Sequence, residues 1–562
     1  FMEDGSEFRL SRREFVRSAA GSAAAALVGA PGCGRSGPVV ESFDADWERG
    51  EVAHLLPTAD HHRILLKASF RRPLAGEPRL HAGGRVVAGV RTDSGGRFYT
   101  FFVEGLAPAT EYSLELRSAA GDLLCDPWPL RTFPAPGTPA DRFRLLAYTC
   151  AGGPDDLLNF DLFGQRLLHA FLPVPHRRRL LARALSFGPD AALANGDHVY
   201  WDMKSRFGWA LGESPWAWWR AGHFDRAQRV LGGANEEVLV RAFGPQIADL
   251  YGVLFRSLPT FFLQDDHDYG ENDEATEVLR TFPADPFMRD LATSTQRLFY
   301  PELLVDAQLP ARHHVTPGIA RSYGQIRYGN LFEALLYDCR QGLTNRLDPA
   351  APAAVSGFLP PDVEAWALDR TARSESLHLA HVPSTPMLWT AGKWGEWYPD
   401  FKDAEGVLRA TAKKPYWPPG WARQHDRLIG AASAQAGRLP LFMSGDLHAT
   451  AAGWIHASNG QSLAANPVLS LLTGAVGTGV LGWPSKFRSQ HPQPSQTLEA
   501  SELVAPLEEN GFSLLDFTPE GLEVRLFRWL PEQGEAAIDS LEPFAVLSFP
   551  RLSPGDARVD LA

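Results

Sequence analysis

The stretch DAALANGDHVY (Asp190–Tyr200) decides the fold, because a short apolar run ends abruptly there in Asn-Gly-Asp-His. Three other runs end in the same way: RLLAYTC (Arg144–Cys150), TFFLQDDHD (Thr260–Asp268) and PLFMSGDLH (Pro440–His448). From Asp141 onward, short apolar runs alternate with helical segments, which predicts a layered α/β fold. Because ligand sites in such folds form where the carboxyl ends of strands converge, we expect these polar residues to form one site.

The four strand ends carry carboxylates together with a thiol, a phenol and imidazoles. Carboxylates gathered at one sheet edge repel one another, and bound metal cations remove that repulsion. Thiolate, phenolate, imidazole and carboxylate are all metal ligands, so the sequence predicts a metal site. For Cys150 we favour the role of a ligand over that of a buried core thiol, because it ends a strand beside the other polar clusters. We favour it over a nucleophile because nearby carboxylates raise the pKa of a thiol.

The motifs GDHVY, DDHD and GDLH, in this order and each after a strand, carry a family resemblance. With Cys150, DDHDYGEND (Asp265–Asp273) and YDCR (Tyr337–Arg340), they resemble the alkaline phosphatase D (PhoD-like) family of calcineurin-like metallophosphoesterases. The resemblance covers roughly residues 40–550. It implies a four-layer calcineurin-like metallophosphatase sandwich of the α/β class over residues 141–550. It also implies a fibronectin-like β-sandwich domain before it, over residues 40–135.

The resemblance also implies a set of metal ligands. Asp197 would bridge two metals, and Tyr200 matches a phenolate ligand of the related purple acid phosphatases. The full predicted set is Cys150, Asp197, Tyr200, Asp266, Asn272, Asp446 and His448. A thiolate with a phenolate favours Fe³⁺, whereas the oxygen-rich remainder favours a hard cation such as Ca²⁺. The second position departs from the family pattern at Asp266 and Asp446, so Mn, Zn or Mg stay open there.

Two adjacent cations would lower the pKa of a water and so provide a hydroxide that cleaves phosphodiesters or phosphomonoesters. We predict that His267 stabilises the transition state or protonates the leaving oxygen. We predict that Arg340 clamps the phosphate in a bidentate manner, with a structural pairing to Asp338 as the alternative. Hydrolysis of phosphotriesters or phospholipid head groups stays open, as does a non-catalytic, metal-stabilised protein that binds phosphorylated ligands.

Residues 40–135 contain short alternating runs separated by Gly/Pro turns, which are typical of a small β-sandwich. The segment LAPATEY (Leu106–Tyr112) resembles a tyrosine corner, in which the Tyr112 hydroxyl bonds back to upstream backbone. The Pro-rich run FPAPGTPA (Phe133–Ala140) predicts a linker. At the other end of the chain, GFSLLDFTPEGLEVRLFRWL (Gly511–Leu530) predicts a β-hairpin.

Several segments around the motifs receive more general interpretations. Residues 203–258 predict a helical insertion whose WAWW cluster (Trp216–Trp219) serves helix packing. The aromatic segment Ser384–Phe401 predicts a pocket wall, in which Lys393, Trp394 and Trp397 are candidates to contact substrate. GTGVLG (Gly477–Gly482) is interpreted as a glycine-rich loop rather than a dinucleotide site, because Trp483-Pro484 follows at once. The pairs His61-His62 and His313-His314 are interpreted as solvated surface.

The composition limits the classes of partner. A formal net charge of −12 argues against a sequence-independent nucleic-acid patch and leaves a small-molecule or polymeric phosphate ester as substrate. SRREFVR (Ser11–Arg17), followed by an apolar stretch too short to span a membrane, predicts a twin-arginine export signal over residues 1–35. We therefore expect a periplasmic or secreted protein, with lipidation at Cys33 as an alternative. Cys125 and Cys339 are expected to be inert thiols.

Overall fold

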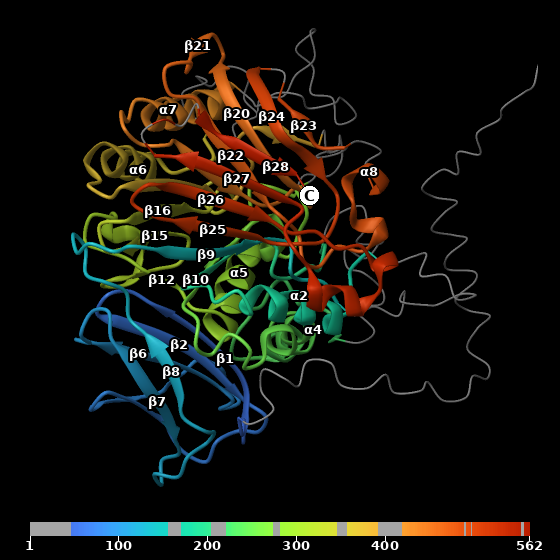
Figure 1. Ribbon diagram of the computed structural model, residues 1–562. Helices are drawn as coiled ribbons and strands as arrows, with labels where there is room; N and C mark the ends of the chain where they lie inside the picture. Colours follow the sequence, from blue (N-terminus) through green and yellow to red (C-terminus); the bar gives the residue numbers. More distant parts are fainter. Residues whose placement is uncertain are drawn as a thin grey trace, which may run out of the picture. The chain divides into compact units, whose positions relative to one another are not determined.

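Two four-stranded antiparallel sheets come first in the computed structural model, which describes residues 47–154, 170–203, 221–273, 281–344, 357–391, 419–487, 491–495, 497–551, 553 and 556–561. One sheet joins β1 (Val52–Ala59), β2 (Arg63–Phe70), β6 (Phe98–Glu104) and β5 (Val90–Arg91), and the other joins β4 (Arg85–Ala88), β3 (Arg79–Ala82), β7 (Glu111–Arg117) and β8 (Trp128–Arg131). Both are drawn in blue in Figure 1. Side chains from the two sheets, such as Phe101 and Trp128, bury one common core.

The predicted tyrosine corner is confirmed in this region. The Ala107 N–H donates a hydrogen bond of 2.7 Å to the Tyr112 hydroxyl, which fixes the turn before β7.

A seven-stranded sheet contains the first three strands with polar ends. β9 (Phe143–Tyr148), β10 (Ala191–Asn195) and β11 (Thr260–Leu263) are parallel neighbours, with β10 in the middle. β25 (Ser513–Phe517) joins the other edge of β9 in antiparallel pairing, and β26 (Gly521–Leu526), β27 (Ala545–Pro550) and β28 (Arg558–Leu561) extend the sheet. β25 and β26 are paired from Ser513 with Leu526 to Phe517 with Leu522, which confirms the predicted C-terminal hairpin.

A second large sheet contains the fourth polar strand end. Its strands run in the order β15 (Tyr323–Tyr328), β16 (Phe332–Tyr337), β17 (His378–Pro383), β19 (Leu441–Ser444), β22 (Val468–Thr473), β20 (Thr450–Ser458) and β21 (Gln461–Ser462), with β24 (Leu498–Leu507) paired to β20. The pairs β16–β17, β17–β19 and β19–β22 are parallel.

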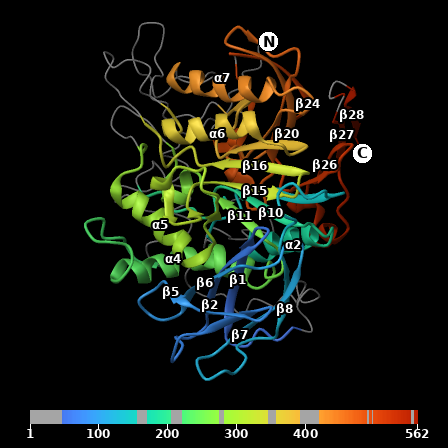
Figure 2. The ribbon, with the colours of Figure 1, turned by 90° about the vertical axis from the view of Figure 1, so that its left-hand side faces the viewer.

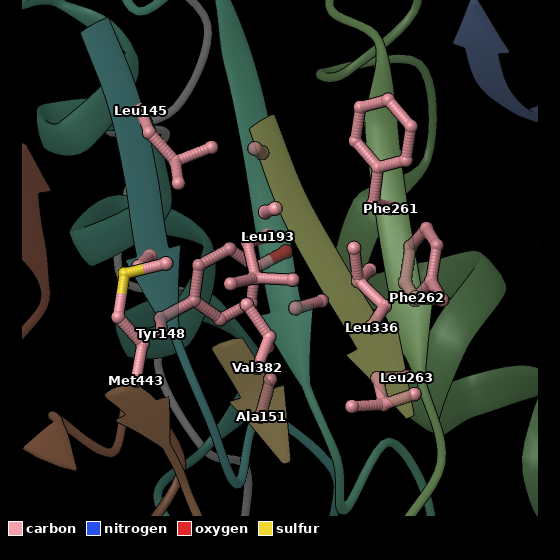
Figure 3. Close-up of a cluster of buried hydrophobic side chains, with 14 of the residues drawn as sticks. Leu145, Tyr148, Ala151, Leu193, Phe261, Phe262, Leu263, Leu336, Val382 and Met443 are labelled. Atoms are coloured by element: carbon pink, nitrogen blue, oxygen red, sulfur yellow. The ribbon is translucent and has the colours of Figure 1, made fainter. Parts of the chain in front are cut away.

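The two large sheets face one another through an apolar core. Figure 3 shows Leu145 and Leu193 of the first sheet close to Leu336, Val382 and Met443 of the second. Near-continuous apolar runs such as ALAN and LFMS belong here, because strands buried on both faces cannot alternate with polar residues. The polar residues begin only where the strands end.

Helices accompany each sheet. α2 (Val174–Leu185), α4 (Ala234–Tyr251) and α5 (Pro286–Phe299) belong to the first half, and α6 (Pro361–Arg373) and α7 (Pro419–Ser433) to the second. Figure 2 shows α6 and α7 side by side, and they are in contact. α5 begins where Asp285 accepts a hydrogen bond from the Met288 N–H, with Pro286 in the first helical turn. Together these elements form the predicted four-layer α/β sandwich.

None of the helices in the described part of the chain has the length and apolarity needed to cross a membrane.

Candidate metal centre

The backbone is strained at the predicted site. Non-glycine residues seldom adopt a positive φ, and each such residue costs of order 1–3 kcal/mol unless its surroundings hold it there. Cys150, Asp197, Asp446 and His448 have φ values of 50°, 59°, 67° and 49°, and Asp202 has 50°. Four of these five are predicted ligands, and a concentration of strain in one place is typical of a functional site.

One group of donors lies between the two large sheets. Cys150, Asp197 and His448 each offer a ligand atom, and these atoms lie within 4.8 Å of one another. Cys150 Sγ is 3.4 Å from Asp197 Oδ2. The Tyr200 hydroxyl is 2.9 Å from Asp197 Oδ2 and 3.1 Å from His448 Nε2. The structure thus brings together the thiol, phenol, imidazole and carboxylate that the sequence suggested.

Two further groups adjoin the first. Asp197, Asp266 and His267 form one, and Asp265, Asp266 and Asp446 form the other, each with donor atoms within 4.8 Å. Asp197 belongs both to the cluster with Cys150 and His448 and to the cluster with Asp266 and His267. A ligand that bridges two metals needs this position.

The remaining predicted ligand, Asn272, is buried next to Asp273, whose N–H donates to Asp266 Oδ2 over 3.0 Å.

Two buried carboxylate oxygens support a cation here. Asp197 Oδ1 and Asp265 Oδ2 have no hydrogen-bond partner among the residues that the structure describes. A buried carboxylate oxygen without a donor is costly, and a coordinated cation satisfies it. The residues present therefore fit a metal.

The electrostatics of the protein alone lead to the same conclusion. Burial, followed by the charge of Asp266, raises the pKa of Asp197 to about 8. Burial and then the charge of Asp197 raise the pKa of the Cys150 thiol well above its ordinary value. Burial lowers the pKa of His267, but Asp266, Asp202 and Asp197 outweigh it and raise that pKa to about 10. These groups hold protons in the absence of a cation, and a bound cation reverses that preference.

Arg340 differs from its predicted role. Its guanidinium is 1% exposed, and its three nitrogens lie 2.7 Å from Asp265, 2.5 Å from Asp273 and 3.4 Å from Asp446. Only its backbone N–H, not its side chain, donates to Asp338. Because the donors of the guanidinium already face carboxylates, we replace the phosphate clamp with the role of a fixed counter-charge that holds the acidic segments together.

Three positioning residues were not identified from the sequence. Asp268 accepts hydrogen bonds of 2.8–2.9 Å from the N–H groups of Asp197, His198 and Asp265. Gln246 of α4 accepts from the N–H groups of Gly153 and Tyr200 over 2.8 Å each. Thr478, in the predicted glycine-rich loop, lies 2.9 Å from His448 Nδ1 and fixes that ring. No local pattern marks these roles, because every partner except Asp265 is distant in sequence.

His267 has its own carboxylate neighbour. Its Nδ1 lies 3.1 Å from Asp202 Oδ1, and its ring lies against Tyr200 with centroids 4.1 Å apart. Asp202 thus orients the imidazole over the donor groups.

Glycines permit the close approach of the strand ends. A Cβ on Gly445 would lie 2.2 Å from Thr149 Oγ1 and 2.4 Å from the Asn195 carbonyl oxygen. The glycine of the GDLH motif therefore lets β19 approach β9 and β10.

Other predicted residues lie elsewhere or outside the described residues. The donors of Asp60, His61 and His62 lie within 4.8 Å of one another, but the Asp60 carboxylate already accepts from Arg63 and two backbone N–H groups. His313, interpreted as solvated surface, has a side chain only 15% exposed. Cys125 and Cys339 are buried free thiols, and burial raises the pKa of each to about 12. The export segment, the WAWW cluster, Lys393, Trp394 and Trp397 lie outside the described residues.

The sheets, their layers and the donor cluster together define a calcineurin-like metallophosphatase fold. Among solved structures, the structure of PhoD matches with a TM-score of 0.57 and 12% identity, over 91% of this chain and 92% of that one. The purple acid phosphatase PPD1 from yellow lupin (Lupinus luteus) seeds matches with a TM-score of 0.48 and 11% identity, over 86% and 72% of the two chains.

No protein-family profile and no curated protein sequence matches the chain. The likeness to PhoD is therefore one of fold, and at that level the predicted resemblance is confirmed.

Proposed function

We propose that this chain is a metal-dependent phosphoesterase that cleaves phosphodiesters and phosphomonoesters. One observation carries the proposal: Asp197 belongs at once to the cluster with Cys150 and His448 and to the cluster with Asp266 and His267. That arrangement suits two adjacent cations of different character, for which we propose Fe³⁺ beside Cys150 and Tyr200, and Ca²⁺ beside Asp266 and Asp446.

When bound, such cations supply Lewis acidity toward phosphoryl oxygens and lower the pKa of water at the site. The protein's own residues orient the groups around them. His267, paired with Asp202, presents an imidazole that can carry a proton beside the candidate ligands. We assign it the donation of that proton to the leaving oxygen of the ester.

Arg340 contributes as a positioning residue. By pairing with Asp265 and Asp273, it holds the segment after β11 against the carboxyl end of β16, which Arg340 follows. Such a counter-charge limits repulsion among the acidic groups before cations bind.

The experiment is elemental analysis of the purified protein, with p-nitrophenyl phosphate and bis-p-nitrophenyl phosphate hydrolysed by the same sample. Asp197→Asn should lose both metals and both activities, because one carboxylate serves both groups. Asp306→Asn, which removes a carboxylate outside the cluster, should keep metal and activity.

A protein that is metal-replete yet inert toward both esters would contradict the proposal and favour a binding protein for phosphorylated ligands. Activity toward a phosphotriester or a phospholipid head group alone would keep the site and change the substrate.

We further propose export by the twin-arginine route on the basis of Arg12-Arg13. Replacing both arginines by lysine should retain the protein in the cytoplasm of an expressing bacterium, as measured by fractionation. Unchanged export would contradict this assignment.

A further inference from the structure

A second, small cavity lies beside the segment that carries Arg340. It measures about 240 Å³ and lies between η2 (Ala311–His313), the start of β15 and the turn at Gln341-Gly342. The polar side chains that line it are those of Arg312, His313, His314, Arg321, Tyr323 and Gln341. All of them are hydrogen-bond donors or cations, and none is a carboxylate.

Tyr323 is the buried part of this lining. The residue is 1% exposed, yet its hydroxyl has no hydrogen-bond partner in the described part of the chain. An ideal Cβ on Gly342, another lining residue, would lie 2.9 Å from that hydroxyl oxygen. The Tyr323 hydroxyl and Pro360 therefore both lie close to the backbone of Gly342, where a side chain would not fit. A buried donor without an acceptor is costly, so this position favours a ligand that accepts a hydrogen bond.

Arg321 supplies an unused charge. Its guanidinium makes no hydrogen bond or ion pair with any described residue, although it is half-buried. Burial lowers the pKa of Arg321 below its ordinary value, which expresses the cost of holding this charge away from water. The neighbouring Arg312 and His313 differ, because both contact Asp362. Asp362 is therefore already engaged, and Glu302, the carboxylate whose charge acts most strongly on Arg321, pairs with Lys67. Arg321 is thus available to an anion.

The size of the cavity limits the ligand. Sites for drug-sized molecules run from about 300 to 1,000 Å³, so about 240 Å³ suits one small group. Oxyanions such as phosphate and sulfate accept hydrogen bonds on several oxygens and match a guanidinium fork. A cation or an apolar group would leave these donors unsatisfied.

We propose that this cavity is an oxyanion site in which Arg321, the Tyr323 hydroxyl and the Gln341 amide bind a phosphate or sulfate group. It is distinct from the metal centre but adjacent to it along the chain: Gln341 follows Arg340, and its N–H donates to Asp338, which accepts from the Tyr269 hydroxyl. Tyr269 ends the segment Asp266–Tyr269 that carries two groups of the metal centre. The site therefore holds either a second phosphate of the substrate or free phosphate.

The test measures binding of inorganic phosphate by calorimetry to the full chain carrying Asp197→Asn, so turnover plays no part. One phosphate should bind, and both Tyr323→Phe and Arg321→Gln should weaken it, by about fivefold and at least tenfold respectively. Arg558→Gln, which removes an exposed arginine on β28, should leave binding unchanged. Tyr323→Phe removes only the hydroxyl, so it keeps the test decisive if Arg321→Gln destabilises the fold.

Failure of the two variants to change phosphate binding, or no binding to the Asp197→Asn chain, would overturn the proposal whatever the activity of the metal centre. The source of the anion follows from kinetics in the otherwise unaltered chain. If the anion belongs to the substrate, Tyr323→Phe raises KM for an ester with a second phosphate but not for p-nitrophenyl phosphate. If it is free phosphate, both KM values stay and only phosphate affinity falls.

Discussion

At the scale of single residues, the imidazole of His267 allows the sharpest test of the chemistry. If it protonates the leaving oxygen, its loss matters most for esters whose leaving group is a poor one. His267→Gln should lower kcat by about 10²- to 10⁴-fold for phenyl phosphate, and by clearly less for p-nitrophenyl phosphate. Asp202→Asn, which only removes the orienting carboxylate, should give a smaller loss with the same trend. Equal losses for both esters would assign His267 to metal or substrate binding.

Buried histidines away from the metal centre should make stability depend on pH. Burial lowers the pKa of His54 and of His378 to about 4 and that of His381 to about 3, against 6.5 in the unfolded chain. The unfolded state therefore binds more protons between about pH 6.5 and 4. This contribution to stability is fully present above pH 6.5 and is lost as the pH falls, by up to about 3 kcal/mol each for His54 and His378 and about 5 kcal/mol for His381.

His381→Gln tests this directly, because His381 is buried against Phe442 and is not one of the candidate ligands. At about pH 8 the variant should have a lower melting temperature than the parent. Between about pH 8 and 4.5, its melting temperature should fall by less than that of the parent. His456→Gln, a partly exposed histidine bonded to Ser501, is the matched control. Parallel melting curves of the parent and His381→Gln against pH would contradict the assignment.

At the scale of elements, the close approach of β19 to β9 and β10 depends on Gly445. An added Cβ would meet the Asn195 carbonyl, which is backbone and cannot move aside without shifting β10. Gly445→Ala should therefore cost about 1 to 3 kcal/mol in the free energy of unfolding and lower metal content as well. Chemical denaturation and elemental analysis measure the two effects.

Gly244→Ala in α4 is the control for Gly445→Ala. Its Cβ would have ordinary contacts at 3.9 Å to Phe299. Pro245 disfavours a Cβ on the preceding helical residue and offsets the higher helix propensity of alanine, so the free energy of unfolding should change by less than about 1 kcal/mol. If the Gly445→Ala chain were as stable as this control and bound as much metal, the strand ends would tolerate a side chain that the structure excludes.

The same elements show how far the sequence could predict the structure. The four polar strand ends were identifiable because a buried strand must stay apolar until it leaves the sheet. The partners of Arg340 were not, because Asp265 and Asp446 lie 75 and 106 residues away and only the fold brings them together. The pairing of β25 with β9 was equally hidden, since the hairpin pattern predicts its two strands but not their neighbour. The half-buried position of His313 follows from its contact with Asp362, which no local pattern contains.

At the scale of the whole molecule, the candidate metal centre joins the two large sheets. Cys150, Asp197 and Asp266 follow strands of one sheet, whereas Asp446 and His448 follow β19 of the other. Chelation should therefore loosen both strand ends together, because the buried carboxylates lose the cations that offset their repulsion. The melting temperature should fall, by an amount that corresponds to about 4 kcal/mol if the metals are present at a thousandfold excess over Kd.

Hydrogen exchange monitored by mass spectrometry locates that effect. Faster exchange is expected after chelation at the ends of β10 and β19, with unchanged exchange in β2 and β6. Restoring the metals should restore protection. Uniform loosening throughout, or none at all, would contradict a metal that joins the sheets.

The position of β25 next to β9 has a consequence for synthesis on the ribosome. Residues 143–147 pair with residues 513–517, so one edge of β9 stays unpaired while some 370 residues are still being added. At bacterial and eukaryotic translation rates this lasts roughly 20 to 70 s. Asn510, just before β25, also bonds to Thr478, which orients His448. The nascent chain must therefore protect an open strand edge for most of its translation, and the full set of donors takes shape only as its last tenth emerges.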